Sequence, residues 1–221
     1  MNLNVEKILI IGLGMIGGSI AMASKSKGIK VVGFDAEIDY LNVAVNKEII
    51  DESINSLEEI NSKEYIKDID LVVLAVPPKQ TLEVLNNIKE IWNTDTTITD
   101  TSSVKNHIKL ENVSNIILSH PIAGSDQSGL SAADGNLFKD KKNVLCNPFD
   151  CSKEHFDKVD NFWKNALQMR TSLMTVSEHD LVFAMTSHLP HLIAYPLIDS
   201  IRLSNHDVGD NAGGGVKDCI R

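Results

Sequence analysis

Short apolar runs alternate with amphipathic segments along the first 150 residues. The apolar runs predict strands at 7–11, 30–34, 70–76, 96–100, 115–119 and 143–146. Their continuous apolar character is typical of parallel strands that are buried on both faces. Between them, helical spacing predicts helices over 15–27, 37–47, 78–92 and 103–109. This alternation predicts βαβ units and therefore a Rossmann-type α/β fold with a doubly wound, mostly parallel sheet.

The pattern changes after residue 150. Segment 152–168 has helical spacing, and "RTSLMTVSE" from Arg170 favours one more strand. From residue 178 the chain is helical, and Pro190 and Pro196 predict kinks or a break. We therefore expect a sheet domain over 1–177 and an all-helical domain over 178–221. The helical pattern is still in progress where the sequence stops, so we expect this second domain to be truncated.

The composition narrows the class of protein. With 43% apolar and 23% charged residues among 221, the chain is typical of globular proteins. It has no run of about 18 apolar residues and no signal-peptide pattern, so we expect no membrane contact. A net charge of −9 argues against a broad nucleic-acid surface. Three cysteines without metal or disulfide spacing indicate reduced thiols and a cytoplasmic location.

A glycine motif joins the first strand to the first helix. "ILIIGLGMIGGS" places Gly12, Gly14 and Gly17 in the context of a dinucleotide-binding fingerprint. Gly12 permits the tight turn, Gly14 lets the backbone approach a pyrophosphate, and Gly17 lets the helix pack closely on the strand. Met15 and Ile16 lie between them at the positive end of the helix dipole, so they are also candidate cofactor-binding residues.

An acidic residue follows the second strand. Asp35 occupies the position of the carboxylate that hydrogen-bonds the ribose 2′-hydroxyl of NAD and repels the 2′-phosphate of NADP. Because no arginine follows it, the sequence predicts NAD as the cofactor. The alternative is a solvated aspartate that caps the next helix. Val76 and Pro77 lie at the carboxyl end of the predicted strand 70–76 and are predicted to wall the cofactor.

Two further strand ends carry polar clusters. In "TDTSSVKNH", Ser102 or Ser103 is predicted to cap the helix 103–109. In "SHPIAGSDQSG", His120 follows the strand 115–119 and would lie in the same crevice, near a nicotinamide.

A histidine there is suited to catalysis. Its ordinary pKa of about 6.5 fits a general base for a hydroxyl whose carbon loses a hydride. A purely structural histidine is the alternative. The small residues Gly124 and Ser125 follow His120 in a loop that we expect to shape a substrate site.

The helical region contributes three more histidines. His188 and His191 are three residues apart, which places them on one helix face, and His179 is close enough in sequence to be considered with them. A metal site is one interpretation. However, no acidic partner of the HExxH type accompanies them, and hydride transfer to a dinucleotide needs no metal, so we expect none.

Together these segments resemble the prephenate dehydrogenase family, which includes arogenate and cyclohexadienyl dehydrogenases. The matching segments span essentially the whole chain and occur in the family's order: "GLGMIGGS", "DLVVLAVPP", "TDTSSVK", "SHPIAGSDQSG", "EHDLVFAMTSHLPHLIA" and "GGGVKDCIR". The resemblance implies NAD-dependent oxidative decarboxylation of prephenate to 4-hydroxyphenylpyruvate in tyrosine biosynthesis. For a full-length member of the family it also implies a homodimer.

The resemblance also suggests roles for individual residues. His120 looks like the catalytic histidine that bonds the ring hydroxyl of the substrate, and Ser103 looks like the serine placed beside it. The family's loop is closer to "DVGSVK", so Ser102, which we also expect among the cofactor-binding residues, stays open as the alternative to Ser103. The other residues that resemble substrate-binding positions are His179, His188, His191 and the carboxylate-binding Arg221.

Other functions stay open. Arogenate could be the substrate instead of prephenate. Hydroxyacid or imino-acid dehydrogenases usually employ a lysine on their helical domain, and Lys217 is the only lysine after residue 178, which disfavours them. A dinucleotide-binding fragment without catalysis is the third interpretation.

Overall fold

The computed structural model describes residues 5–61, 66–125 and 127–203. The chain forms two compact units, which divide between Val176 and Ser177. The segment "GGGVKDCIR", which includes Arg221, lies outside the described residues.

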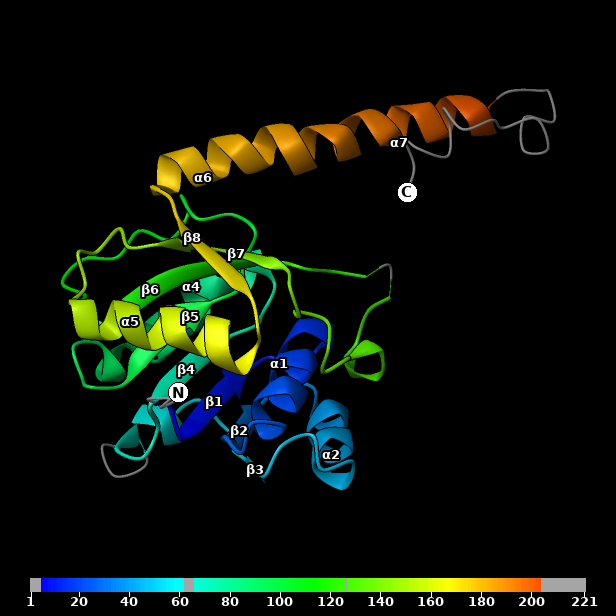
Figure 1. Cartoon of the computed structure of the whole chain (residues 1–221). Coiled ribbons are helices and arrows are strands. Elements are labelled where there is room, and N and C mark those ends of the chain that lie inside the picture. The colour runs from blue at the N-terminus through cyan, green and yellow to red at the C-terminus, as the bar shows by residue number, and fades with distance from the viewer. Residues whose placement is uncertain (1–4, 62–65, 126, 204–221) are drawn as a thin grey trace. The chain divides into compact units, whose positions relative to one another are not determined.

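The first unit is built on one sheet. Within the described residues eight strands are joined in the order β3-β2-β1-β4-β5-β6-β7-β8 (Figure 1). Neighbours from β3 to β6 run parallel, β7 is antiparallel to β6, and β8 is parallel to β7. The strands are β1 (Lys7–Ile11), β2 (Lys30–Phe34), β3 (Glu52–Ser53), β4 (Leu71–Leu74), β5 (Thr97–Asp100), β6 (Ile116–Ile122), β7 (Lys142–Cys146) and β8 (Arg170–Leu173). The prediction of a mostly parallel α/β sheet is confirmed.

Helices cover both faces of this sheet. Figure 1 shows α1, α2 and α5 on one side and α4 on the other. Their bounds are α1 (Met15–Lys25), α2 (Ile38–Asn46), α4 (Pro78–Asn87) and α5 (Lys153–Asn161). A π-helical turn, Phe162–Ala166, extends α5 and buries Trp163 against the strands. This packing fixes the sheet, so the loops at the carboxyl ends of its strands start from rigid positions.

The predicted helix 103–109 is absent. After β5 the chain runs through 101–110 as an irregular loop. A helix would have placed Lys105 among solvated side chains, whereas this lysine is fully buried against Asp100. The ion pair overrides local helix propensity here. The predicted helix 78–92 also ends early, at Asn87, and a 3₁₀ turn (Lys89–Ile91) follows.

The second unit is a long helix as far as it is described. α6 (Val176–Phe183) continues through a π-helical turn (Ala184–His188) into α7 (Leu189–Arg202). Pro190 and Pro196 were predicted to cause kinks or a break, and no break occurs, since α7 runs through both prolines. A proline has no N–H to donate to the carbonyl group four residues earlier in the helix. The π-helical turn Ala184–His188 contains the residue four positions before Pro190, so the helix accommodates the missing bond there. The ring of His191 hydrogen-bonds the Ser187 carbonyl oxygen in the same stretch, at 2.7 Å.

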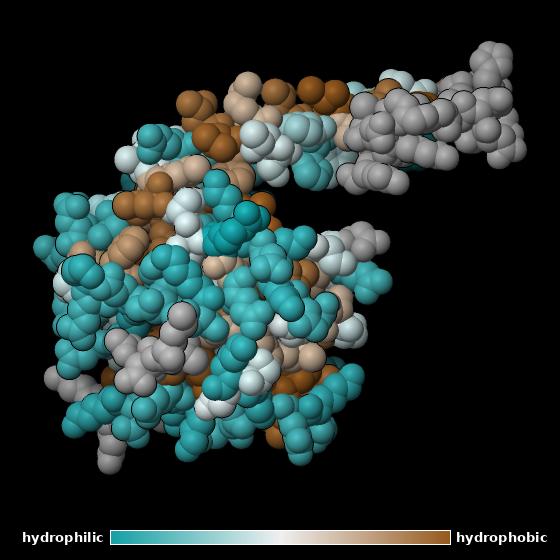
Figure 2. Space-filling model, in the orientation of Figure 1, coloured by the Kyte–Doolittle hydropathy of each residue, from teal (hydrophilic) through white to brown (hydrophobic). Residues whose placement is uncertain are grey.

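The second unit carries an apolar surface. Figure 2 shows hydrophobic residues along this helix. Leu181, Met185 and Leu192 are among the large apolar residues of this unit that are exposed. The helix from Val176 to Leu203 has 28 residues and is long and apolar enough to cross a membrane. Helices of soluble proteins pass the same test of length and composition, so the expected absence of membrane contact stays a prediction.

Candidate active site

A cleft of about 870 Å³ opens at the carboxyl ends of β1, β2, β4 and β5. This is the edge at which open α/β sheets bind their ligands. Most residues predicted to bind cofactor or to act in catalysis line it: Gly12, Gly14, Met15, Ile16, Asp35, Val76, Pro77, Ser102, Ser103 and His120. The fold therefore brings residues from five separate segments of the sequence to one cavity.

The glycine loop has the shape that its motif requires. Gly12 has a φ of +96°, and a Cβ there would lie 2.6 Å from the carbonyl oxygen of Ala75. A Cβ on Gly17 would lie 1.8 Å from the carbonyl oxygen of Gly12, so only glycine lets α1 start this close to the strand. A Cβ on Gly14 would meet nothing within 4 Å. Gly17 is thus needed for packing, whereas Gly14 faces open space in the cleft.

Asp35 joins the second strand to the glycine loop. One of its carboxylate oxygens accepts the backbone N–H of Leu13 at 2.6 Å, and the other accepts the N–H of Glu37 at 2.9 Å. The carboxylate thus shapes both the glycine loop and the entry to α2. Each oxygen has a second lone pair, so these bonds leave capacity for a ribose hydroxyl.

A buried ion pair connects the segments that carry Ser103 and His120. The Lys105 ammonium donates to both Asp100 oxygens, at 2.8 and 2.7 Å, and to the carbonyl oxygen of Ser119. Asp100 in turn accepts the N–H of Ser119 at 3.0 Å and the Ser102 hydroxyl at 2.6 Å. These bonds tie the loop after β5 to β6 at the residue before His120.

These hydrogen bonds distinguish the two candidate serines. The Ser102 hydroxyl is directed to Asp100 and the residue is buried, whereas Ser103 is half-buried on the cleft wall.

His120 lies within β6, and not after its end as the sequence predicted. Pairing with β5 stops at Ile117, but β6 continues to Ile122 by pairing antiparallel with β7. Because side chains alternate along a strand, Ser119 faces the core, where Trp163 donates to its hydroxyl at 3.0 Å. His120 points to the other face and lines the cleft.

Within the first unit, three predicted site residues do not line this cleft: Gly17, Gly124 and Ser125. His179, His188 and His191 belong to the second unit, where His179 hydrogen-bonds Asp180 at 2.8 Å and packs on Phe183. In the described part of the chain, no three His, Cys, Asp or Glu side chains are grouped to hold a metal ion.

Neither Lys105 nor its partner Asp100 was predicted from the sequence as a site residue, although Asp100 ends the predicted strand 96–100. An aspartate at the end of a buried strand needs a cation, and "TDTSSVK" offers one five residues later. That requirement was the available signal.

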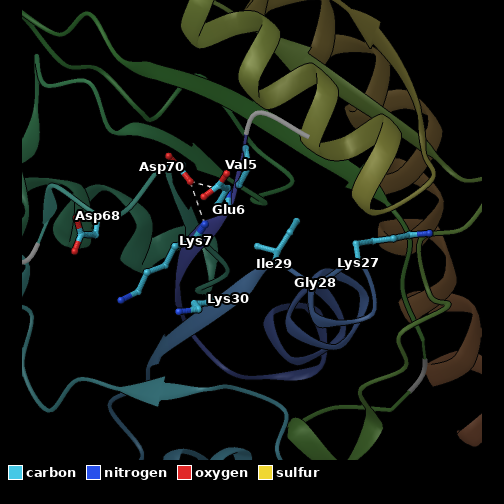
Figure 3. A pocket seen from close by; sticks show the side chains of 9 residues that line it. All are labelled: Val5, Glu6, Lys7, Lys27, Gly28, Ile29, Lys30, Asp68 and Asp70. Carbon is cyan, nitrogen blue, oxygen red and sulfur yellow. Dashed lines mark hydrogen bonds between the residues drawn. The ribbon is translucent and has the colours of Figure 1, made fainter. Parts of the chain in front are cut away.

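A second hollow lies at the amino ends of β1 and β2 (Figure 3). Two of its charged side chains, Asp70 and Lys7, hold other parts of the fold. The Asp70 carboxylate accepts the backbone N–H groups of Glu6 and Lys7, at 2.7 and 3.0 Å, and the Lys7 ammonium pairs with Glu52 at 3.2 Å. We assign no ligand to this hollow.

Comparison with known families identifies both units. Residues 20–169 match the nucleotide-binding domain of prephenate dehydrogenase, and residues 175–221 match its dimerization domain. The chain belongs to the prephenate dehydrogenase family. This confirms the resemblance that the motifs indicated, the Rossmann-type domain followed by a helical one, and a nucleotide cofactor as the ligand class of the first unit.

Individual members differ in substrate. The chain is 34% identical to the prephenate dehydrogenase of Lactococcus lactis over 98% of this chain and 61% of that protein. It resembles prephenate dehydrogenase from Aquifex aeolicus, solved with hydroxyphenyl propionate and NAD+, with 32% identity and a TM-score of 0.87 over 99% of this chain and 78% of that one. It also resembles Synechocystis arogenate dehydrogenase, with 25% identity and a TM-score of 0.81 over 97% of this chain and 78% of that one. The chain thus spans about three-fifths of the length of the L. lactis protein.

Proposed function

We propose that this protein catalyses the NAD-dependent oxidative decarboxylation of prephenate to 4-hydroxyphenylpyruvate, a step of tyrosine biosynthesis. The observation that carries the proposal is the single cleft in which the glycine loop, Asp35, Ser103 and His120 meet. The A. aeolicus relative, solved with NAD+ and a hydroxyphenyl ligand, supports both the cofactor and the aromatic product class.

The residues present fit NAD. The open space at Gly14 accommodates a pyrophosphate at the start of α1, where backbone N–H groups and the helix dipole favour an anion. The Asp35 carboxylate suits an unphosphorylated ribose and disfavours the 2′-phosphate of NADP. When bound, NAD supplies the acceptor for a hydride.

His120 would accept the proton of the substrate's ring hydroxyl as the hydride leaves the same carbon. The carbonyl that results is conjugated, through the ring double bonds, with the ring carbon opposite it, which bears the carboxylate. When that carboxylate leaves as CO₂, its bonding electrons pass through the ring to the carbonyl oxygen, which takes up a proton, and an aromatic phenol forms. Ser103, half-buried on the same wall, would hydrogen-bond the reacting hydroxyl or His120. We favour Ser103 over Ser102 because the Ser102 hydroxyl already donates to Asp100.

The substrate carries a carboxylate beside its reacting ring, so a cation is needed. We propose Arg221 for this role, and His179, His188 and His191 for further polar contacts, since a planar guanidinium binds a carboxylate through two hydrogen bonds. Gly124 and Ser125 are proposed to shape the loop around the substrate. We further propose a cytoplasmic homodimer, which the match of residues 175–221 to a dimerization domain supports.

Two alternatives are tested together with this proposal. Arogenate differs from prephenate in one side-chain group, and the arogenate dehydrogenase of Synechocystis shares this fold. A dinucleotide-binding fragment would bind NAD without turnover.

The deciding experiment follows NADH at 340 nm with prephenate or arogenate, and NAD+ or NADP+, at matched concentrations. Decarboxylation is followed separately as released CO₂. We expect NADH and CO₂ in equal amounts with prephenate and NAD+. Faster turnover of arogenate would change the substrate, and preference for NADP+ would contradict the role of Asp35. Binding of NAD+ without turnover of either compound would leave only the nucleotide-binding function.

A further inference from the structure

A tyrosine on α2 lies at the cofactor cleft but was not among the predicted site residues. Tyr40 is the third residue of α2, which begins shortly after Asp35. Side chains in a first helical turn point back toward the start of the helix, so its ring reaches over the loop after β2. The ring packs partly against the core, and the residue lines the cleft together with Asp35 and Ala36.

The tip of this side chain is polar and has no protein partner among the residues that the structure describes. The hydroxyl of a packed tyrosine usually forms a hydrogen bond, because the ring is buried while its polar end still needs a partner. Here the packed ring holds the hydroxyl on the cleft wall at the Asp35 end. In this position the hydroxyl can donate a hydrogen bond to a ligand bound in the cleft.

A distant segment of the chain limits the space around that hydroxyl. Gly129 lines the same cleft and has a φ of +80°, and a Cβ there would lie 3.0 Å from the Tyr40 hydroxyl oxygen. The next residue, Leu130, is held on α1, because a Cβ on Gly18 would lie 2.6 Å from its Cδ1 atom. Nearby, the Asp134 N–H donates to the Ser19 hydroxyl at 2.9 Å. These contacts fix the position of Gly129. Because glycine has no side chain, the space beside the Tyr40 hydroxyl stays open.

We infer that the Tyr40 hydroxyl hydrogen-bonds the ribose–phosphate of the adenosine half of the dinucleotide, and that Gly129 keeps this position open. The inference rests on the proposed function. A dinucleotide with its ribose at Asp35 and its pyrophosphate at Gly14 would pass beside this hydroxyl. A neutral phenol can donate to a ribose or phosphate oxygen without the repulsion that a carboxylate would add in a chain of net charge −9.

The test measures binding of NAD+ and of ADP-ribose, which lacks the nicotinamide, by calorimetry on the full chain. Tyr40→Phe keeps the packed ring and removes the donor. We expect it to raise the Kd of both ligands by the same factor, about three- to tenfold, as for the loss of one neutral hydrogen bond. Its melting temperature should stay that of the wild type. Tyr195→Phe removes the same hydroxyl from α7 and serves as the matched control.

Gly129→Ala tests the second half of the inference. Alanine there should weaken binding through the unfavourable φ and through contact with the hydroxyl, which Tyr40→Phe removes. The two changes combined should therefore raise the Kd by less than the product of their separate factors. Independent factors would overturn the role of Gly129.

The outcomes separate this inference from the proposed function. If the wild type binds both ligands and Tyr40→Phe binds them equally well, the assignment of Tyr40 is wrong and the proposed function is untouched. If Tyr40→Phe weakens NAD+ but not ADP-ribose, the hydroxyl does not serve the adenosine half and the inference is also wrong. A wild type that binds neither ligand would overturn the proposed function and this inference with it.

Discussion

Lys105 and Asp100 form a fully buried ion pair, with the ammonium 2.7 and 2.8 Å from the two carboxylate oxygens. Both partners also hold the backbone of Ser119, Lys105 at its carbonyl oxygen and Asp100 at its N–H. The residue after Ser119 is His120. The pair therefore connects the loop that carries Ser103 with the strand that carries the proposed base, and it sets the register between them.

Breaking this pair should affect stability and catalysis differently. Lys105→Met leaves the Asp100 carboxylate buried without a cation, which should lower the free energy of unfolding by about 3–5 kcal/mol. Adding Asp100→Asn removes that uncompensated charge, so the double variant should be more stable than Lys105→Met alone in urea titrations. Its turnover should still be about 10- to 100-fold below that of the wild type, because His120 is less well held. Wild-type turnover in the double variant would show that the pair serves stability alone.

The proposed role of His120 is tested by replacing it with asparagine, which is similar in shape but cannot act as a base. His120→Asn should lower turnover by about 10²–10⁴-fold, the usual contribution of a general base. The Kd of NAD+ should change little, because the glycine loop and Asp35, which we propose to hold the cofactor, line other parts of the cleft. The comparison is His155→Gln, which removes a histidine from α5, outside the cleft. An unchanged rate in His120→Asn would refute the role of base.

The strands and the glycine loop could be predicted because their signals are local. Continuous apolar runs give the buried strands, and β1 and β2 begin and end where the pattern predicted. The glycine spacing likewise depends on contacts within one βα turn. The family then followed from motifs such as "SHPIAG".

The missing parts depend on contacts between residues far apart in the sequence. The loop 101–110 is irregular because Lys105 turns inward to Asp100 and Ser119, and no local pattern shows that choice. β6 extends through His120 because β7 returns antiparallel beside it. The position of α2 places the Tyr40 hydroxyl at the cleft, and Gly129, which is 89 residues later in the sequence, lies beside that hydroxyl. Each of these features requires the assembled sheet.

Two glycines of the same motif should respond in opposite ways. Gly14→Ala places its methyl group in open space, so the melting temperature should stay near the wild-type value. The methyl group would fill the room proposed for the pyrophosphate, so the Kd of NAD+ should rise about tenfold or more. Gly17→Ala collides with the carbonyl oxygen of Gly12 and should cost about 1–3 kcal/mol of folding free energy. Melting scans and NAD+ titrations of both variants check this contrast. A folded Gly14→Ala variant with wild-type affinity would exclude pyrophosphate binding at this position.

His155 should make the first unit sensitive to acid. Its ring lies 2.7 Å from the Thr97 hydroxyl, and burial, followed by the nearby charge of Lys158, holds the pKa of His155 below its ordinary value. A depressed histidine pKa means that the unfolded chain takes up the proton first as the pH falls. The neutral ring therefore contributes its full stability above the unfolded pKa of about 6.5. That contribution is lost as the pH drops from this value through the lower pKa of the folded state.

The variant His155→Gln removes the titrating group, and a glutamine amide can still hydrogen-bond Thr97. We expect its free energy of unfolding to fall less steeply than that of the wild type when urea titrations are compared between pH 7 and pH 5. His191→Gln on the exposed surface of α7 is the matched control, and it should keep the slope of the wild type. The direction is the decisive feature. If removing His155 makes the chain more sensitive to acid, the folded state must favour the charged ring, and burial cannot be what dominates its pKa.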